Sequence, residues 1–408
     1  MTVKLADVLA ARERISDGIV MTPVIPALAL RERLSCALHL KLENTQRTGS
    51  FKDRGALNRM LDLTAEERQR GIVTASAGNH AQAVAYHGRR LGVPVEVVMP
   101  EHTPLVKVAN TRHFGAGVRF HGSTLSDAMV EARRLEGEEG LVLVHAFDDD
   151  LVIAGQGTIG LELLEQLPSL TSVIVPIGGG GMISGIAVAI KEQRPDVRIF
   201  GVEASAAASA AASRKAGKVI HIETSDTIAD GIAVKQVGDR TFPIIERYVD
   251  DIVAVNETQI AAAVHLLLEQ EKVLAEGAAA TPLAALLAGL LPLGGDEVAV
   301  MILSGGNIDV NLVGRIIDRG LVADGRLARL CVTARDRPGF LALVTQIVAD
   351  EGANVLDVSH SRAFADIGVR DVEILVSLET RGRSHVKKVI ERLEREGVAV
   401  RMTPHPSA

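Results

Sequence analysis

Aromatic residues are scarce in this sequence: they make up 2% of the 408 residues, and tryptophan is absent. Proteins that bind single-stranded nucleic acid stack the bases on aromatic side chains, so this class is disfavoured. The net charge of −7 also lacks the basic excess that phosphate backbones attract. We therefore expect no nucleic-acid partner, and a core built from Val, Ile, Leu and Ala.

Cysteine is almost as rare, since the chain has only Cys36 and Cys331. Two cysteines so far apart in sequence form neither a metal-ligand spacing nor a disulfide framework. The sequence therefore predicts a reducing, cytoplasmic compartment and no metal site.

Long hydrophobic runs are missing as well. The longest uncharged run, residues 277–295, is rich in Ala and Gly and is interrupted by Pro282 and Pro292. This pattern predicts a buried helix and not a membrane span. Residues 1–18 carry charges throughout and have no apolar core, so we do not interpret them as a signal peptide. We expect no membrane partner.

What the sequence does have is an alternation of short apolar runs with helical patterns between residues 41 and 303. The runs predict strands at 71–75, 94–99, 118–120, 141–144, 172–175, 198–202 and 299–303, and helices at 79–91, 105–114, 126–136 and 183–192. Such alternation is typical of an α/β fold with parallel sheets and right-handed crossovers. The region is too long for one compact sheet, so we expect two lobes with a cleft between them.

The composition changes near residues 320–329, after which a smaller pattern begins. Strands are predicted at 330–334, 354–361, 369–378 and 398–402, and helices at 340–351 and 384–396. This βαββαβ order is ferredoxin-like. We therefore predict a first domain over 1–320 (with its smaller lobe at about 48–150), a linker over 321–329, and a second domain over 330–408.

The segment 41–58, KLENTQRTGSFKDRGALN, places Lys52 in the first turn of a predicted helix. Ser50 is a possible N-cap there, with Asp53 three residues later. A helix N-terminus and partial burial both lower a lysine pKa, and a neutral amine can form a Schiff base with an aldehyde such as pyridoxal phosphate (PLP). Taken alone, the segment is equally typical of a surface lysine in a solvated turn, and that interpretation is favoured until the other motifs are considered.

The segment 76–82, SAGNHAQ, follows a predicted strand and opens a helix. Small residues at a helix N-terminus expose backbone N–H groups, which bind anions such as a substrate carboxylate. The Asn79 amide could hold a phenolic oxygen. An ordinary strand-to-helix turn is the alternative.

Two glycine-rich turns complete the set. Residues 176–182, PIGGGGM, contain four glycines that let the backbone wrap around a phosphate at a helix N-terminus. They fit neither a dinucleotide fingerprint nor a P-loop. Residues 304–307, SGGN, follow a strand and so lie where open α/β sheets bind ligands.

Jointly, SFKDRGA, SAGNHAQ, GGGGM and SGGN resemble the fold-type II PLP-dependent serine/threonine dehydratase family, and most closely its threonine ammonia-lyase group with a C-terminal ACT domain. The resemblance covers nearly the whole chain. It implies a tryptophan synthase beta-like catalytic fold. The ACT assignment rests on the βαββαβ order, on 336–339, DRPG, and on 352–354, GAN.

The resemblance also implies roles for particular residues. Lys52 would carry PLP and act as the catalytic base, while the Ser304 hydroxyl would face the pyridine nitrogen. The implied cofactor-binding residues are Lys52, Phe51, Asn79, Gly178, Gly179, Gly180, Gly181, Met182, Gly231 and Ser304. The implied substrate-binding residues are Ser76, Gly78, Asn79 and His80, and the implied effector-binding residues are Asp336, Gly339 and Asn354.

The implied reaction converts L-threonine, and L-serine, to 2-oxobutanoate, or pyruvate, and ammonia by β-elimination of water. A small amino acid such as isoleucine, valine or the substrate would regulate it at the ACT domain, unless that domain only dimerises the protein. A homodimer or homotetramer is expected.

Several alternatives remain open. Serine racemases share this framework, but they usually have a second serine where this chain has Ala77, so racemisation is disfavoured. A 3-hydroxyaspartate ammonia-lyase, a β-replacing synthase, and a ligand-sensing regulator on an inactive enzyme fold are the others. Some relatives bind a divalent cation after the sequence Gly-Val-Glu; here Glu203 is kept, but Ser209 stands where an aspartate is expected, so no metal is assigned.

Overall fold

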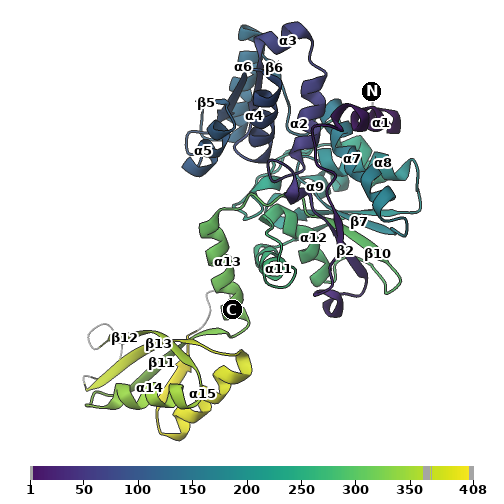
Figure 1. The fold of residues 1–408 in the computed structure, drawn as a ribbon. Coiled ribbons are helices and arrows are strands. Elements are labelled where there is room, and N and C mark those ends of the chain that lie inside the picture. The colour runs from purple at the N-terminus through teal and green to yellow at the C-terminus, as the bar shows by residue number, and fades with distance from the viewer. Residues whose placement is uncertain (1–2, 362–367, 369, 404–408) are drawn as a thin grey trace. The chain divides into compact units, whose positions relative to one another are not determined.

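The computed structural model describes residues 3–361, 368 and 370–403. The chain forms two compact units, residues 1–308 and residues 309–408, and each is described by itself (Figure 1). The α/β class predicted for the first part of the chain is confirmed. Within the described ranges, no helix combines the length and the apolar character needed to cross a membrane.

The larger sheet of the first unit has the strand order β1-β2-β10-β7-β8-β9. Only β1 is antiparallel to its neighbour, while the other pairs are parallel. The strands are β1 Val24–Pro26, β2 Ala37–Lys41, β7 Ser172–Pro176, β8 Arg198–Ala204, β9 Asp251–Val255 and β10 Val298–Ile302. Every residue of β7 is buried, as the continuous apolar run of a central parallel strand requires.

A second parallel sheet, of order β5-β4-β3-β6, forms the smaller lobe. Its strands are β3 Ile72–Ala75, β4 Val95–Met99, β5 Gly117–Phe120 and β6 Val142–Leu143. All lie within a residue or so of the predicted ranges, because each is a short apolar run between a turn and a helical pattern.

In the described residues of the first unit, 3–308, the chain forms twelve α-helices. They are α1 Leu5–Ile15, α2 Lys52–Leu61, α3 Ala65–Arg70, α4 Asn79–Leu91, α5 Leu105–His113, α6 Leu125–Glu139, α7 Asp150–Gln166, α8 Gly181–Lys191, α9 Ser209–Ala216, α10 Phe242–Tyr248, α11 Glu257–Glu269 and α12 Gly277–Leu287. Helix α7 packs against α8 and α2, and α2 packs in turn against α4. Helix α2 therefore touches helices of both lobes (Figure 1).

The second unit carries an antiparallel sheet of order β12-β13-β11-β14. Its elements are α13 Val310–Ala323, β11 Leu327–Arg335, α14 Phe340–Asp350, β12 Asn354–Ser361, β13 Asp371–Glu379, α15 Arg383–Arg395 and β14 Ala399–Met402. The predicted βαββαβ order is confirmed after α13. Alternate residues of β13 are buried, and they form one core with the apolar faces of α14 and α15.

Two sequence-based expectations differ from the structure. The residues expected to form a linker, 321–329, instead end α13 and begin β11, so only 324–326 lie between elements. Helix α13 itself belongs to the second compact unit. At α2 the N-cap is Phe51 and not Ser50, because Asp53 turns its carboxylate back to the N–H and hydroxyl of Thr48.

Candidate active site

Lys52 is the first residue of α2, and its side chain is half-buried. Its Nζ donates a hydrogen bond to the Ala146 carbonyl at 2.7 Å and lies 5.0 Å from the centre of the Phe51 ring. Burial lowers the pKa of Lys52 to about 8, and the negative charge of Glu276 opposes that shift. A substantial fraction of this amine is therefore neutral near pH 8, as a Schiff-base lysine requires.

The glycine-rich turn at 178–181 follows β7 and opens α8, whose N-cap is Gly180. Gly180 has φ +89°, a conformation that favours glycine. The Gly179 carbonyl accepts hydrogen bonds from the Gly238 N–H at 3.1 Å and from the Thr241 hydroxyl at 2.7 Å. Because a trans peptide directs its N–H opposite to its C=O, the Gly180 N–H points away from these partners and is placed to bind an anion at the start of α8.

The same turn lies against two neighbouring loops. A Cβ atom on Gly179 would come within 2.3 Å of the Phe147 ring, and one on Gly178 within 2.9 Å of Ile232 Cα. Met182, the second residue of α8, is buried in the core of the larger lobe. The cradle therefore depends on glycine because its neighbours leave no room for side chains.

The segment 76–80 leads from β3 into α4. Ser76 and His80 are buried, while Gly78 and Asn79 are half-buried. The first N–H groups of α4 have no acceptor within the helix, so they offer an anion site. The imidazole of His80 is directed elsewhere: its Nε2 lies 3.0 Å from the Val144 carbonyl, and burial lowers its pKa to about 3. His80 is therefore neutral, and only its backbone can hold a carboxylate.

The turn at 304–307 is bonded directly to the segment that precedes Lys52. The Phe51 N–H donates to the Ser304 carbonyl at 3.0 Å, and the Gly306 N–H donates to the Gly49 carbonyl at 3.0 Å. Ser304 is 2% exposed. These bonds fix the start of α2, and with it Lys52, to the end of β10.

Two loops of the site were not identified from the sequence. Residues 145–147 follow β6 and link Lys52, through Ala146, to the glycine turn, through Phe147. Glu276 precedes α12, and its carboxylate accepts from Asn79 Nδ2 at 2.8 and 3.0 Å. Neither segment has a distinctive motif; their only sequence signal is their place directly before a helix or after a strand.

Contacts between these loops close into a ring. Lys52 touches Ala146, Phe147 touches the glycine turn, and Gly178 lies against Ile232. Gly231 lies near Glu276, and the remaining contacts run through Asn79, Asn307 and Thr48 back to the segment before Lys52. The structure thus brings all four predicted motifs together. An amine of lowered pKa, an anion cradle and an amide donor around one place fit the aldehyde, phosphate and phenolic oxygen of PLP.

Beside this ring lies a cluster of buried charges. Lys41 at the end of β2, Glu43, and Arg54 on α2 are fully buried, and Glu162 on α7 is 4% exposed. Arg54 bonds both carboxylates, at 2.8 Å to Glu43 and 2.5 Å to Glu162, and Lys41 bonds Glu162 at 2.5 Å. Two positive and two negative groups therefore neutralise one another while joining β2, α2 and α7.

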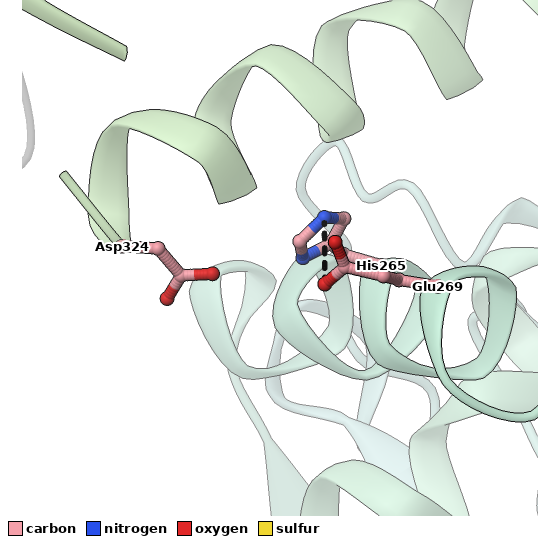
Figure 2. Close-up of side chains that lie close together, drawn as sticks. All are labelled: His265, Glu269 and Asp324. Carbon is pink, nitrogen blue, oxygen red and sulfur yellow. Dashed lines mark ion pairs between the residues drawn. The ribbon is translucent and has the colours of Figure 1, made fainter. Parts of the chain in front are cut away.

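Two other features bear on metal binding. The Glu203 carboxylate accepts the backbone N–H groups of Ala210 and Ala211, each at 2.8 Å, at the start of α9. On α11, His265 Nε2 lies 3.8 Å from Glu269 Oε2 one turn later (Figure 2). Two side chains on one helix are fewer than the ligands of an ordinary zinc site, so we treat this contact as an ion pair.

The predicted effector residues lie in the second unit. Gly339 is the N-cap of α14 with φ +85°, and Asp336 and Asn354 are exposed. Asn354 Nδ2 donates to Glu379 at 3.3 Å, and the Asp336 N–H donates to the Arg370 carbonyl at 3.0 Å.

Residues 15–305 match the family described as pyridoxal-phosphate dependent enzyme. The chain belongs to this family. Residues 325–397 match the ACT domain. The predicted resemblance and its cofactor are thereby confirmed, and the PLP enzyme has a C-terminal ACT domain.

Relatives of this PLP enzyme are similar over nearly its whole length. An L-threonine ammonia-lyase of Thermotoga maritima is 45% identical, over 98% of this chain and 99% of the relative. An L-threonine ammonia-lyase of Geobacter sulfurreducens is 47% identical, over 96% and 97%. The solved structure of serine racemase from Dictyostelium discoideum is 38% identical, with a TM-score of 0.71, over 76% of this chain and 100% of that one.

Proposed function

We propose that this PLP enzyme is an ammonia-lyase that converts L-threonine, and L-serine, to the 2-oxo acid and ammonia. The observation that carries the proposal is the identity of 45–47%, over nearly full length, to two L-threonine ammonia-lyases. The half-buried amine of Lys52, in a ring of four predicted motifs, supports it independently.

The cofactor would be held by the residues of the ring. Lys52 would bind its aldehyde, and the backbone N–H groups of 178–182 its phosphate. Asn79 would bond its phenolic oxygen and Ser304 its ring nitrogen, with Phe51 and Gly231 against its faces. When bound, PLP withdraws electrons from the substrate Cα and so weakens the Cα–H bond.

The remaining chemistry falls to the chain itself. The N–H groups around Ser76, Gly78, Asn79 and His80 would hold the substrate carboxylate and so orient Cα toward Lys52. The substrate amine would replace Lys52 at the aldehyde, and the freed amine of Lys52 would accept the Cα proton, since burial lowers its pKa to about 8. The β-hydroxyl then departs as water, and hydrolysis of the product returns one water, so threonine yields one 2-oxobutanoate and one ammonia.

The test is 2-oxo acid formation from L-threonine, L-serine and 3-hydroxyaspartate by purified protein. We expect threonine to give the highest kcat/KM. A methylene-sized difference is worth about 1–3 kcal/mol, so serine should react as well. Turnover of 3-hydroxyaspartate alone, or a requirement for a second nucleophile, would contradict the proposal.

A second candidate function is serine racemisation, favoured by the similarity to the Dictyostelium enzyme. Against it stands Ala77, which has no proton to deliver to the face of Cα opposite a base. Chiral analysis of serine recovered from the reaction separates the two functions.

We further propose that the ACT domain binds an amino-acid effector near Asp336, Gly339 and Asn354. Isoleucine, valine and threonine are the candidates, to be tested by calorimetric titration and by their effect on turnover. Asn354→Ala should weaken effector binding. Deleting residues 330–408 should abolish the response; a response that survives the deletion would refute the assignment.

We propose that the catalytic domain, predicted over 1–320, is the compact unit 1–308 and that the regulatory domain, predicted over 330–408, is the compact unit 309–408, in a homodimer or homotetramer located in the cytoplasm. Cys36 and Cys331 are both free and buried, which is compatible with a reducing compartment. Light scattering of the purified protein tests the oligomeric state.

A further inference from the structure

Glu276 lies where three loops of the ring meet. It is 5% exposed, and its N–H donates to the Gly305 carbonyl at 3.1 Å. A Cβ on Gly305 would lie 2.5 Å from Glu276 Oε1, and one on Gly231 would lie 3.5 Å from the same oxygen. The carboxylate is therefore enclosed between the turn at 304–307 and the loop around Gly231.

The carboxylate does not serve the helix that it precedes. Glu276 is the N-cap of α12, yet the structure, which describes this whole segment, shows no hydrogen bond from the first turn of α12 to its side chain. Both oxygens instead accept from Asn79 Nδ2. A side chain that caps a helix accepts hydrogen bonds from the first N–H groups of that helix, so the Glu276 carboxylate does not cap α12.

The Asn79 amide is held in one orientation by partners of opposite type. Its Nδ2 faces Glu276, an acceptor when ionised, while its Oδ1 accepts from Asn307 Nδ2 at 2.8 Å. Asn307 Nδ2 is itself anchored on the Thr48 carbonyl at 2.8 Å. Because the two carboxylate oxygens lie side by side, one N–H of Asn79 can serve both, which leaves the second N–H for a ligand.

The charged groups around Glu276 come from three elements. Asp230 belongs to the loop that contains Gly231 and pairs with Lys107 of α5 at 2.5 Å, and Lys52 begins α2. Burial raises the pKa of Glu276 to about 7; Asp230 adds to the rise, while Asn79, Lys107 and Lys52 oppose it. The carboxyl group thus changes its charge within the working range of an ordinary enzyme.

We propose that Glu276 is a positioning residue of the active site: its carboxylate keeps the Asn79 amide turned toward the cofactor and contributes a negative charge that favours the charged form of Lys52. The inference rests on the proposed function only in that Asn79 and Lys52 face PLP. Protonated Glu276 can donate as well as accept, so it no longer dictates the orientation of the Asn79 amide. It also no longer stabilises the charged form of Lys52.

The first test uses cofactor-free protein and follows the rate of recombination with PLP as a function of pH. Recombination needs the neutral amine, so the wild-type rate should have its midpoint near pH 8. Glu276→Gln keeps an acceptor for Asn79 but removes the charge, and should move the midpoint down by about one pH unit. Glu276→Leu also leaves a buried Asn79 donor unpaired and should weaken PLP binding about tenfold.

The matched control is Glu203→Gln. Glu203 is also buried with a pKa raised to about 7 by burial, but its partners are backbone N–H groups of α9. It should leave the recombination midpoint where the wild type has it. An unchanged midpoint in Glu276→Gln, or an equal shift in both variants, would overturn the proposal.

The second test is the pH profile of kcat/KM with L-threonine. The wild type should lose activity at acidic pH as both Lys52 and Glu276 protonate, and Glu276→Gln should keep only the contribution of Lys52, so that its acidic limb is less steep. An identical limb in both proteins counts against Glu276. Recombination with PLP needs no substrate, so a shifted midpoint without threonine turnover would leave this inference standing and refute only the proposed function.

Discussion

Lys52 and Arg54 lie two residues apart on helix α2, yet their surroundings balance charge differently. Burial acts to lower the pKa of Arg54, but Glu43 and Glu162 outweigh it and raise the pKa above its ordinary value. For Lys52, burial prevails over the distant charge of Glu276, and the pKa falls to about 8. One turn of helix α2 thus carries Arg54, which stays charged, and Lys52, whose amine can lose its proton. The difference is that carboxylates bond Arg54 directly.

The largest effect should come from substituting Lys52, the amine that is able to lose its proton. Lys52→Ala removes both the amine that binds the cofactor and the proposed base, so 2-oxobutanoate formation should fall at least about 1,000-fold. The visible absorbance of the lysine-bound cofactor should vanish too, while circular dichroism keeps the wild-type spectrum. Residual turnover within tenfold of the wild type would exclude Lys52 as the catalytic residue.

Substitution of Arg54, the cation with direct carboxylate partners, should lower the stability of the protein. Arg54→Met leaves Glu43 and Glu162 buried with less compensation, and should lower the free energy of unfolding by about 3–5 kcal/mol. Denaturant titration measures the loss. Arg12→Met is the control, because Arg12 also pairs with a carboxylate, that of Glu165, but both side chains are exposed.

The Arg12 variant should leave the unfolding midpoint nearly unchanged. Equal losses of unfolding free energy in the two variants would show that the buried cluster around Arg54 stabilises the protein no more than an exposed ion pair does.

In cofactor-free protein, the contribution of Glu276 to stability should depend on pH differently from that of the buried charge cluster around Arg54. The folded pKa of Glu276, about 7, exceeds the ordinary value of 4.5, so the folded state binds the extra proton between these values. The contribution of Glu276 to stability should therefore fall by about 3 kcal/mol as pH rises from 4.5 to 7, and Glu276→Gln should remove this falling contribution. Glu203 acts in the same sense, so the double variant with Glu203→Gln should lose more of it. The lowered pKa of His80 acts in the opposite sense, so the variants are compared with the wild type at each pH.

The buried charge cluster around Arg54 should not contribute to the fall in stability between pH 4.5 and 7. The pKa of Glu43 is held below its ordinary value because Arg54 and Lys41 outweigh the effect of burial. Its stabilisation is therefore present above pH 4.5 and is lost only at lower pH. Unfolding titrations at pH 5, 6 and 7 check both statements, and the same pH dependence in the wild type and Glu276→Gln would contradict the first.

The smallest effect is expected from a proton donor added to the proposed substrate-binding loop before α4. Ala77 lies between Ser76 and Gly78 in the loop before α4 and is half-buried. Ala77→Ser should raise racemisation of L-serine about tenfold, followed by chiral chromatography. Racemisation by the parent enzyme at a rate comparable to its deamination would contradict the role given to Ala77.

Sequence patterns predicted the elements whose signals are local. The helix predicted at 79–91 is α4, Asn79–Leu91, which is followed by Gly92 with φ +66°. The four motif turns were found for the same reason, since each combines small residues with a preceding apolar run. The turns after β7 and β10 lie together because these strands are parallel neighbours whose carboxyl ends share an edge, whereas the turn after β3 comes from the other sheet.

What the sequence could not reveal depends on contacts between distant segments. Lys41, Glu43 and Arg54 look like ordinary surface charges in the sequence, and only folding brings Glu162 to them. Glu276 has no motif because its partner Asn79 comes from the other lobe. Ser50 was predicted as an N-cap because Asp53 follows at the right spacing, but Asp53 bonds Thr48 instead.

The strand order of the larger sheet has a consequence for synthesis of the chain. Strand β10, residues 298–302, pairs with β2 on one side and β7 on the other. The ribosome makes β2 about 250 residues before β10, a delay of about 10–50 s at roughly 5–20 residues per second. Until β10 is made, one edge of β2, and from its own synthesis onward one edge of β7, stays unpaired, and other chains can join these edges. We expect that nascent chains of this enzyme depend on a chaperone until β10 is made.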